Sequence, residues 1–383
     1  MATTTEDTEA KGKHPFQMSN RSSNLSMGIV GLPNVGKSTF FNRLTQSSVR
    51  AENFAFCTID PAVGQTKIDD PRVKFLASVY KPKKTVLACL NVTDIAGLVK
   101  GASEGQGLGN QFLDNIRNVD GIFLMVRCFD NPEIVHVETS IDPLRDIKTI
   151  KDELRIKDME ILEKILIKTE KEQRSKTVTK KMEKELSTLR RMCDIVKTKW
   201  INEDSYDKEE ISFINTLNLL TTKNVVILAN ISAEHYEKRK ANVHLKNVIK
   251  AFGDSVIPLS ATYVEENMDI NSQLPADVVN KIVQKAYHSL NLINFFTVGK
   301  DEVRSWTITK GDKAPKAGSA IHSDFEKYFV CAEIMAYNDF VSNPSEAQMR
   351  AAGKYLQKGK EYVVNDGDII LFKSNTPKSG TKK

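Results

Sequence analysis

Residues 31–39 read GLPNVGKST, and this stretch decides how the rest of the chain is interpreted. It fits the phosphate-binding loop pattern G-x-x-x-x-G-K-S/T. An apolar run at 25–30 just before it predicts a buried strand, and residues 40–44 just after it begin a helix. Because strand, loop and helix come in the order that the pattern requires, we favour a phosphate-binding loop over a glycine-rich turn with a chance lysine.

Each position of this pattern has a chemical reason. Gly31 and Gly36 let the backbone turn sharply and approach a phosphate closely. Backbone N–H groups and the N-terminus of the following helix then face the anion. Lys37 is expected to reach the β- and γ-phosphates as a catalytic, charge-neutralising group, and the Ser38 hydroxyl to ligate Mg²⁺. The sequence therefore predicts a nucleoside triphosphate site with Mg²⁺ as cofactor.

The composition of the whole chain narrows the class of protein. Its 383 residues allow two or three domains, and no apolar run is long enough to cross a bilayer. The first 24 residues lack the apolar core of a secretory signal, and the five cysteines lack paired spacing. We therefore expect a cytoplasmic protein without a membrane partner. The net charge of +6 suits contact with RNA or a ribosome, although many housekeeping enzymes share it.

Two loops after the phosphate-binding loop resemble nucleotide-dependent switch segments. Thr58, in the loop 53–61, could complete the Mg²⁺ shell when a γ-phosphate is present, the alternative being an ordinary polar loop threonine. Asp94 ends an apolar strand at 86–93, which suits a metal-side carboxylate. Gly97 offers an amide that can approach the γ-phosphate, so we include it among the catalytic candidates.

The second switch segment has an unusual residue and an unusual composition. Residues 101–109 contain four glycines in nine positions, which indicates a mobile segment or, alternatively, a plain flexible loop. Ras-like GTPases place a water-orienting glutamine directly after the glycine that corresponds to Gly97. Leu98 occupies that position here and cannot orient water. Hydrolysis must therefore use another group or be slow without a partner.

Further apolar strands at 121–127, 224–229 and 256–262 alternate with helical segments. This alternation predicts an α/β fold with a mainly parallel sheet flanked by helices. Changes in composition and in hydrophobic periodicity divide the chain into six segments. They are a disordered tail at 1–24, the two segments of a nucleotide domain at 25–141 and 222–291, an inserted helical domain at 142–221, a C-terminal module at 292–373 and a basic tail at 374–383.

The inserted and C-terminal parts have their own patterns. In the inserted part, a turn at 174–179 separates two amphipathic helices, which predicts an antiparallel helical hairpin. The second helix carries an apolar stripe: Met182, Leu186, Leu189, Cys193, Val196 and Trp200. Its basic residues could touch RNA or simply form a solvated face. In the C-terminal part, expected strands at 303–308, 362–364 and 369–372, the last two joined by a hairpin, predict a small β-grasp module.

The base-recognition positions favour adenine. GTP-binding proteins carry N-K-x-D after the strand that ends at Asn230, but Ile231 and Ala233 replace the lysine and the aspartate here. A guanine would leave two donors unpaired, and a lost buried hydrogen bond to a charged group costs about 1.5–3 kcal/mol. The backbone of a second loop is expected to close the base pocket: Ser260, Ala261 and Thr262. We therefore expect ATP, while a GTPase of ribosome assembly and a non-hydrolysing ATP-sensing scaffold remain alternatives.

Five motifs together resemble the Obg-like ATPases, the YchF subfamily of translation-factor-related P-loop NTPases. They are GLPNVGKST (31–39), NFAFCTIDP (53–61), DIAGLVKGA (94–102), KGDKAP (310–315) and IHSDFE (321–326). The resemblance implies a G domain, an inserted helical domain and a C-terminal TGS domain of β-grasp type. It also implies Mg²⁺-dependent ATP hydrolysis and association with the ribosome or its large subunit, with ribosomal RNA as a further candidate partner. The implied role is regulation of translation or stress responses, with a monomer as the default state.

The resemblance also assigns residues. It implies that the phosphates are held by Asn34, Val35, Gly36, Lys37, Ser38 and Thr39. Ser38 and Thr58 would ligate Mg²⁺, and the backbone of Ile231 would meet adenine. Because related P-loops with an asparagine at position 34 use a monovalent cation, K⁺ is a second candidate cofactor.

Two positions depart from the family pattern. The family usually has N-x-x-E where Ala233 stands, so that carboxylate has been lost or has moved to Glu234. The family also commonly has a histidine proposed for catalysis at the position of Leu124. With Leu98 and Leu124 both apolar, we expect very slow intrinsic hydrolysis.

Overall fold

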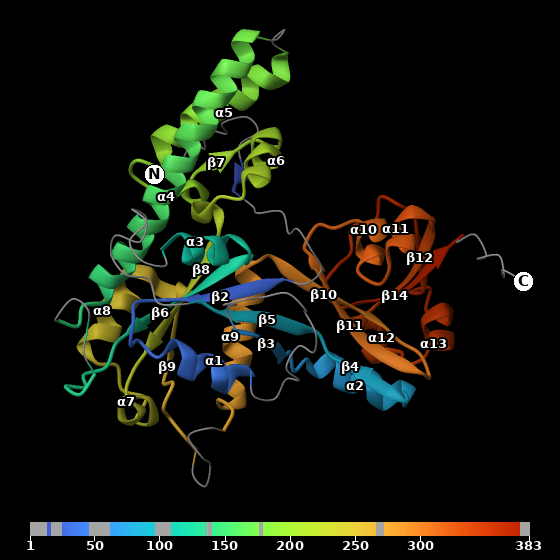
Figure 1. Ribbon diagram of the computed structural model, residues 1–383. Helices are drawn as coiled ribbons and strands as arrows, with labels where there is room; N and C mark the ends of the chain where they lie inside the picture. Colours follow the sequence, from blue (N-terminus) through green and yellow to red (C-terminus); the bar gives the residue numbers. More distant parts are fainter. Residues whose placement is uncertain are drawn as a thin grey trace, which may run out of the picture.

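The structure is a computed structural model that describes residues 14–16, 25–45, 62–95, 109–134, 136, 140–175, 179–265 and 272–375. In these ranges the chain forms two six-stranded sheets, a two-stranded sheet and a helical hairpin that projects away from the sheets (Figure 1). The loops that carry Thr58, Gly97 and Leu98 lie outside the described residues, as do most of the two predicted tails.

The first sheet is mainly parallel, as the sequence predicts. Its strands, in spatial order, are β3 (Ala62–Lys67), β5 (Cys89–Asp94), β2 (Ser26–Val30), β6 (Gly121–Arg127), β8 (Asn224–Asn230) and β9 (Val256–Leu259). The pair β3–β5 is antiparallel and the other pairs are parallel. Every residue of β6 is buried, which is typical of a central parallel strand whose two faces are both covered.

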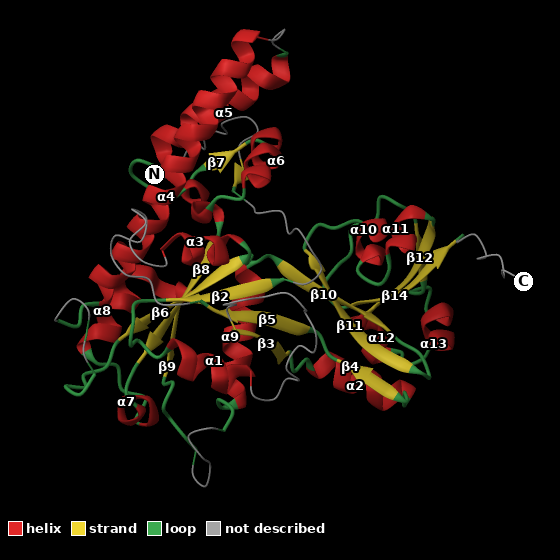
Figure 2. Cartoon of the chain, viewed as in Figure 1, coloured by secondary structure: helices red, strands yellow, loops and turns green. Residues whose placement is uncertain are grey.

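Helices on both sides of this sheet contribute to its core, as do residues 147, 150 and 154 of the inserted part. They are α1 (Lys37–Thr45), α3 (Gly109–Arg117), α8 (Val243–Phe252) and α9 (Ala276–Ser289), with the short α7 (Ala233–Glu237) after β8. Figure 2 shows these helices, in red, around the yellow strands. Apolar side chains of α1, α3, α8 and α9 join one buried cluster with the strands. The arrangement is the P-loop NTPase fold predicted from the sequence.

The inserted part is the predicted hairpin. It consists of α4 (Pro143–Ser175), α5 (Lys180–Ile195) and the shorter α6 (Lys208–Leu217) beside the small β1–β7 sheet (His14–Pro15 and Ser205–Tyr206). Gln173 bonds the carbonyl of Met182 near the tip, and Arg155 bonds that of Val196 near the base, so α4 and α5 are antiparallel. Buried Asp158 of α4 accepts the N–H groups of residues 220 and 221, which ties the hairpin to the entrance of β8.

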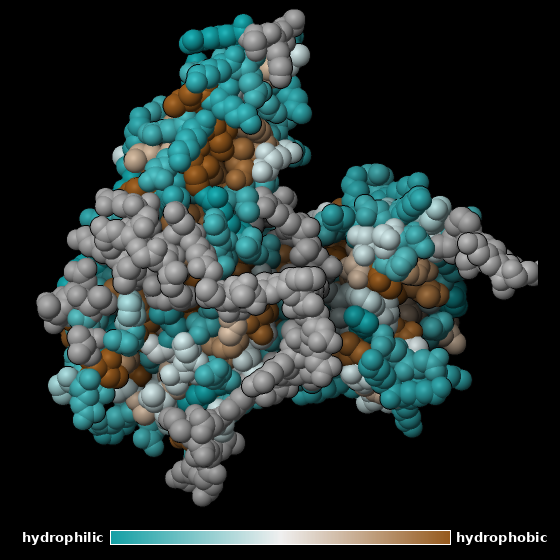
Figure 3. Space-filling model, viewed as in Figure 1, coloured by the Kyte–Doolittle hydropathy of each residue, from teal (hydrophilic) through white to brown (hydrophobic). Residues whose placement is uncertain are grey.

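The predicted apolar stripe of α5 is only partly right. Met182 and Cys193 are half-buried, whereas Met192 is fully buried. Trp200 lies beyond the end of α5 and joins the core of the first sheet instead. The surface of the hairpin in Figure 3 is mostly hydrophilic with an apolar strip along it. Among the described helices, even the 33-residue α4 lacks the run of apolar residues that a bilayer crossing needs.

The C-terminal part forms the second, mixed sheet. Its strands, in spatial order, are β13 (Leu356–Lys358), β12 (Phe329–Ala336), β14 (Asp368–Ser374), β10 (Leu292–Thr297), β11 (Glu302–Thr309) and β4 (Lys84–Val86). Four short helices pack around it: α10 (Ala314–Ser319), α11 (Ser323–Lys327), α12 (Tyr337–Ser342) and α13 (Glu346–Ala351). This is the small mixed-sheet module that the sequence predicts.

The hairpin predicted inside this module is wrong. Residues 362–364 form no strand; Val363 makes one isolated bridge to Lys313, and β14 pairs with β12 and β10. The Asp368 carboxylate accepts the N–H of Asn365 and the hydroxyl of Tyr362, so it closes a turn before β14. The carbonyl of Tyr362 instead accepts the N–H of residue 314 and anchors the start of α10.

One segment crosses from the first sheet to the second and back. Helix α2 (Pro71–Tyr80) and strand β4 lie between β3 and β5 in sequence, yet they pack on the C-terminal sheet (Figure 1). Arg72 of α2 lies 2.7 Å from the Asp366 carboxylate and 5.0 Å from the ring centroid of Phe296. The predicted nucleotide-domain range 25–141 therefore contains a segment that lies with the C-terminal sheet in space.

Candidate nucleotide site

The phosphate-binding loop joins β2 to α1 and has a backbone that only particular residues can adopt. Gly36 has φ of +99° and Asn34 has φ of +64°, both in the left-handed region. A Cβ atom on Gly36 would lie 2.7 Å from Nδ2 of Asn230, and one on Gly31 would lie 2.5 Å from the carbonyl oxygen of Met125. Close packing therefore requires both glycines of the motif, and Gly36 is also required by its backbone conformation.

Lys37 is buried at the first position of α1. Its Nζ donates to the carbonyl of Leu32, 2.9 Å away, so the side chain folds back across its own loop. Burial lowers the pKa of Lys37 to about 8, and the charge of Asp94 offsets part of that effect. An ammonium group that donates to a neutral carbonyl is a good partner for a phosphate anion, because the negative charge of the anion stabilises the charged form that burial disfavours.

Ser38 and Asp94 lie together, as the sequence predicts for the metal side of the site. Asp94 ends β5, in register with residue 29 of the neighbouring β2, and is half-buried. Burial raises the pKa of Asp94, while a hydrogen bond from Ser38 and the charge of Lys37 lower it in part. Ser38 and Thr39 are exposed in the first turn of α1.

These oxygen donors fit Mg²⁺, which is usually bound by one or two carboxylates together with hydroxyl, water and phosphate oxygens. No group of three or more acidic, histidine or cysteine side chains forms a metal cage in the described residues. Mg²⁺ would therefore be held by Ser38 and Asp94 with the phosphates of the substrate. Thr58 and Gly97, the other predicted members of the site, lie outside the described residues.

Asn230 links the phosphate-binding loop to the base loops. Its Nδ2 donates to the carbonyl of Val35 and its Oδ1 accepts the N–H of Ala261, both at 2.9 Å. The N–H of Ile231 bonds the carbonyl of Leu259 at 2.9 Å. A base contact from Ile231 must therefore use its carbonyl, which is the acceptor that the adenine amine requires.

The second base loop, residues 260–262, is a tight turn after β9. The Ser260 hydroxyl accepts the N–H of Tyr263 at 3.2 Å and lies 3.4 Å from the hydroxyl of Thr262. Ser260 and Ala261 are buried, while Thr262 is exposed. These contacts stabilise the turn and occupy the hydroxyl groups of Ser260 and Thr262. Any hydrogen bond from this loop to a base is therefore expected from its backbone.

Arg43 belongs to this site but was not predicted from the sequence. It is 2% exposed, and its guanidinium donates to three backbone carbonyls, those of Ala261, Tyr263 and Ser272. The signal in the sequence is its position on α1, three residues after Phe40 and next to Leu44, both of which are buried. A charged residue on the apolar face of a helix needs buried partners, although the sequence cannot say which ones.

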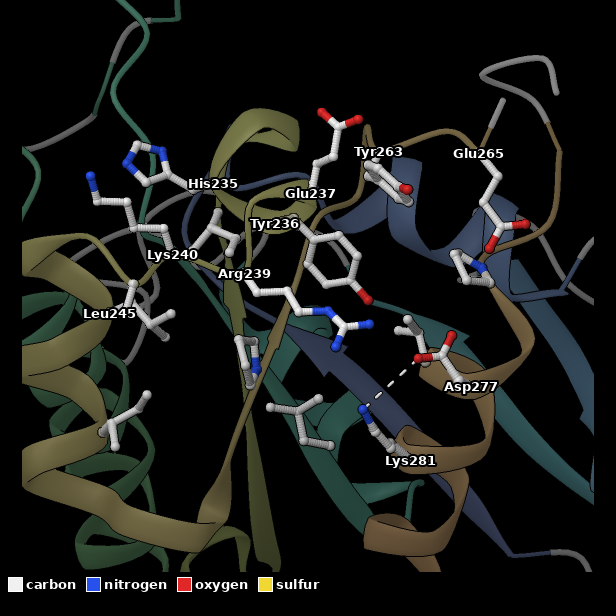
Figure 4. A pocket seen from close by; sticks show the side chains of 17 residues that line it. His235, Tyr236, Glu237, Arg239, Lys240, Leu245, Tyr263, Glu265, Asp277 and Lys281 are labelled. Carbon is white, nitrogen blue, oxygen red and sulfur yellow. Dashed lines mark ion pairs between the residues drawn. The ribbon is translucent and has the colours of Figure 1, made fainter. Parts of the chain in front are cut away.

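A cavity of about 680 Å³ opens beside the base loops, between α7, β9 and α9 (Figure 4). Ile231 and Tyr263 form part of its wall, and the rings of Tyr236 and Tyr263 lie side by side with centroids 5.0 Å apart. Lys281 and Asp277 line the opposite wall as an ion pair at 3.9 Å. Residues 31–39 of the phosphate-binding loop do not line this cavity.

The position of Leu124 bears on catalysis. It lies in β6 in register with Val30, directly before the phosphate-binding loop, and is 1% exposed. A buried leucine at this place cannot hold or activate a water molecule.

Comparisons with known proteins agree with this architecture. Residues 26–173 match the family described as "50S ribosome-binding GTPase", and residues 292–375 match the YchF-GTPase C-terminal family, described as a "protein of unknown function". The chain is 46% identical to "Obg-like ATPase 1" of Gallus gallus and 45% identical to that of Homo sapiens, in each case over 94% of both chains. It is 43% identical to the protein of the same name from Oryza sativa subsp. japonica, over 94% of this chain and 95% of the relative.

A solved structure gives the same result. The YchF GTPase of Schizosaccharomyces pombe superposes with a TM-score of 0.79 at 43% identity, over 94% of this chain and all of that one. The printed names of the relatives include both "ATPase" and "GTPase", so they leave the nucleotide open. The fold, the phosphate-binding loop and these similarities show that the chain belongs to the Obg-like ATPase (YchF) family of P-loop nucleotide-binding proteins.

Proposed function

We propose that this protein binds and hydrolyses ATP with Mg²⁺ and acts as a molecular switch. The main observation that favours ATP over GTP is that Ala233 replaces the aspartate of the N-K-x-D motif at the edge of the base site. The nearest substitute in sequence, Glu234, has a 70% exposed side chain that pairs with Lys238 at 2.7 Å along the outside of α7. A guanine base would therefore find no carboxylate at position 233, and the Glu234 carboxylate is already paired with Lys238.

The described residues support a phosphoryl transfer to water that depends on positioning and charge. Lys37 and the N-terminus of α1 would hold the β- and γ-phosphates, while Ser38 and Asp94 would hold Mg²⁺. The metal supplies neutralisation of the charge that develops on the phosphate oxygens. Since Leu124 cannot activate water, we propose that intrinsic hydrolysis is slow and that a partner accelerates it. K⁺ near Asn34 is a further proposed aid, and equal turnover in K⁺ and Na⁺ buffers would exclude it.

The path of the chain supports a switch role. Helix α2 and strand β4 lie in sequence between the loop of Thr58 and that of Gly97, and they pack on the C-terminal sheet. Ordering of the two loops by ATP would therefore act on the segment that holds the C-terminal domain. The resemblance and the net charge of +6 support the ribosome or its large subunit, or ribosomal RNA, as the partner of a cytoplasmic monomer.

Phosphate release from ATP tests this function, measured with and without purified ribosomes. We expect slow release that ribosomes accelerate and that Lys37→Ala abolishes together with nucleotide binding. Lys83→Ala is the matched control, because the side chain of Lys83 is 82% exposed and lies on the C-terminal sheet. Retention of tight ATP binding by Lys37→Ala would refute the site. Release in neither condition would favour the non-hydrolysing scaffold.

A further inference from the structure

We infer that Arg43 is a positioning residue for the purine base: from the phosphate-binding helix it fixes the backbone of the second base loop. This inference rests on the proposed nucleotide site and deepens it. Asn230 joins the same two loops from β8, so Arg43 would be a second, independent tether between the phosphates and the base.

The geometry of Arg43 is that of a clamp. One terminal nitrogen, Nη1, donates to the carbonyls of Ala261 at 3.0 Å and Tyr263 at 2.6 Å. Nε donates to the carbonyl of Ser272 at 2.9 Å, and the carbonyl of Arg43 itself accepts the N–H of Leu274 at 3.2 Å. Through these hydrogen bonds, Arg43 holds residues 261–263 and 272–274 next to the last turns of α1.

The hydrogen bonds of Arg43 also fix the orientation of the peptide groups that accept them. Burial lowers the pKa of the Arg43 guanidinium, and no acid among the described residues contributes to that shift. The charge is therefore satisfied by carbonyl dipoles, whose orientation a planar guanidinium fixes more strictly than an ammonium group does. Because a trans peptide directs its N–H opposite to its C=O, the N–H of Thr262 points away from Arg43. That N–H is a donor that the loop can present to an acceptor nitrogen of a purine.

The chain contains a matched control for the loss of a buried guanidinium. Arg127, at the end of β6, is also 2% exposed and also donates to three backbone carbonyls, those of Phe129, Asn131 and Ile134, at 2.9–3.1 Å. Burial lowers its pKa as well. All three acceptors lie in its own loop and not in residues 260–262. The N–H of the next residue, Cys128, bonds the carbonyl of Asn230, so Arg127→Met also controls for disturbance of this edge of the sheet.

The test compares ligands with and without a base on the full-length protein. Affinities for Mg·ATP and for Mg·tripolyphosphate are measured by calorimetry for wild type, Arg43→Met, Arg43→Lys and Arg127→Met. We expect Arg43→Met to weaken ATP binding about tenfold or more and to change tripolyphosphate binding by less than about twofold. Arg43→Lys should recover part of the ATP affinity, and Arg127→Met should leave both affinities within about twofold of wild type while lowering the unfolding temperature.

Equal weakening of both ligands by Arg43→Met, or an unchanged ATP affinity, would overturn the inference. So would a loss of ATP affinity in Arg127→Met that matches the loss in Arg43→Met. If Arg43→Met does not fold, Arg43→Lys carries the test, with a loss of about threefold expected for ATP alone. Failure of wild type to bind ATP at all would instead refute the proposed function.

Discussion

Asn230 and Val35 are 195 residues apart in sequence, yet the side-chain amide of Asn230 donates to the carbonyl of Val35 at 2.9 Å inside the protein. The other end of the same amide accepts the N–H of Ala261. This 4% exposed side chain therefore connects the loop that would hold the phosphates to the loop that would hold the base.

Replacement of this side chain should affect both stability and binding. Asn230→Ala leaves one buried carbonyl and one buried N–H without their partner, and we expect the free energy of unfolding to fall by about 2–4 kcal/mol. ATP affinity should fall about tenfold or more in calorimetry. Asn224→Ala is the control, since Asn224 begins the same strand and bonds the carbonyl of Ser289 at the opposite edge of the sheet. Its nucleotide affinity should stay at the wild-type value, and an equal loss in both variants would contradict the account.

The lowered pKa of Lys37 predicts a pH dependence of binding. In the nucleotide-free protein Lys37 loses its proton as the pH rises through about 8, whereas an unfolded chain keeps it to 10.5. A bound phosphate favours the charged form, so ATP affinity should fall by up to about tenfold per pH unit above pH 8, with proton uptake on binding. By the same linkage, Lys37 makes the empty protein more stable as the pH rises from 8 to 10.5, because the unfolded chain then binds more protons.

Calorimetry at pH 7, 8 and 9 in buffers of different ionisation enthalpy measures both the affinity and the proton uptake. Lys37→Arg should remove the dependence, because a guanidinium stays charged throughout this range. A wild-type affinity that does not change between pH 7 and 9 would contradict the assignment of Lys37 to the phosphates.

Asp94→Asn should weaken the dependence of nucleotide binding on Mg²⁺. The amide keeps the size of the side chain but removes the negative charge beside Ser38 and Lys37, so the Mg²⁺ concentration at half-saturation should rise about tenfold. Asp120→Asn serves as control, because Asp120 accepts the N–H of Ser26 at 2.9 Å at the start of β2, away from the phosphate-binding loop. A Mg²⁺ requirement that is unchanged in Asp94→Asn would place the metal elsewhere.

Arg72 should hold α2 on the C-terminal sheet. Arg72→Met removes the contacts with Asp366 and with the ring of Phe296, as well as the ion pair with Asp70 at the N-cap of α2. We expect a loss of about 1–3 kcal/mol of stability. Hydrogen exchange of residues 71–80 should become faster. Lys83→Met removes a neighbouring ion pair with Asp301, but both side chains are more than four-fifths exposed, so exchange should not change. Wild-type exchange in Arg72→Met would show that this contact does not hold the segment.

The sequence was most informative where a local pattern determines its own structure. The phosphate-binding loop was predicted correctly because its glycines, lysine and helix start lie within nine residues. Asp94 was placed beside Ser38 because parallel strands end at one edge of a sheet. The α/β sheet and the helical hairpin followed from hydrophobic periodicity.

The sequence was least informative where the partner lies far along the chain. Strand β4 has three residues and pairs with β11, more than 200 residues later, so nothing local marks it as part of the second sheet. Tyr362 and Val363 are residue types common in strands, but the Tyr362 hydroxyl donates to the Asp368 carboxylate and the segment forms a turn. Arg43 was missed because its three acceptors are backbone carbonyls, which every residue carries.

Competition between ATP and GTP for the wild-type protein, followed by calorimetry in Mg²⁺, tests the central claim most directly. With no carboxylate at position 233 to meet the guanine donors, we expect ATP to bind about tenfold to a hundredfold more tightly than GTP. Equal affinity, or tighter binding of GTP, would contradict the account.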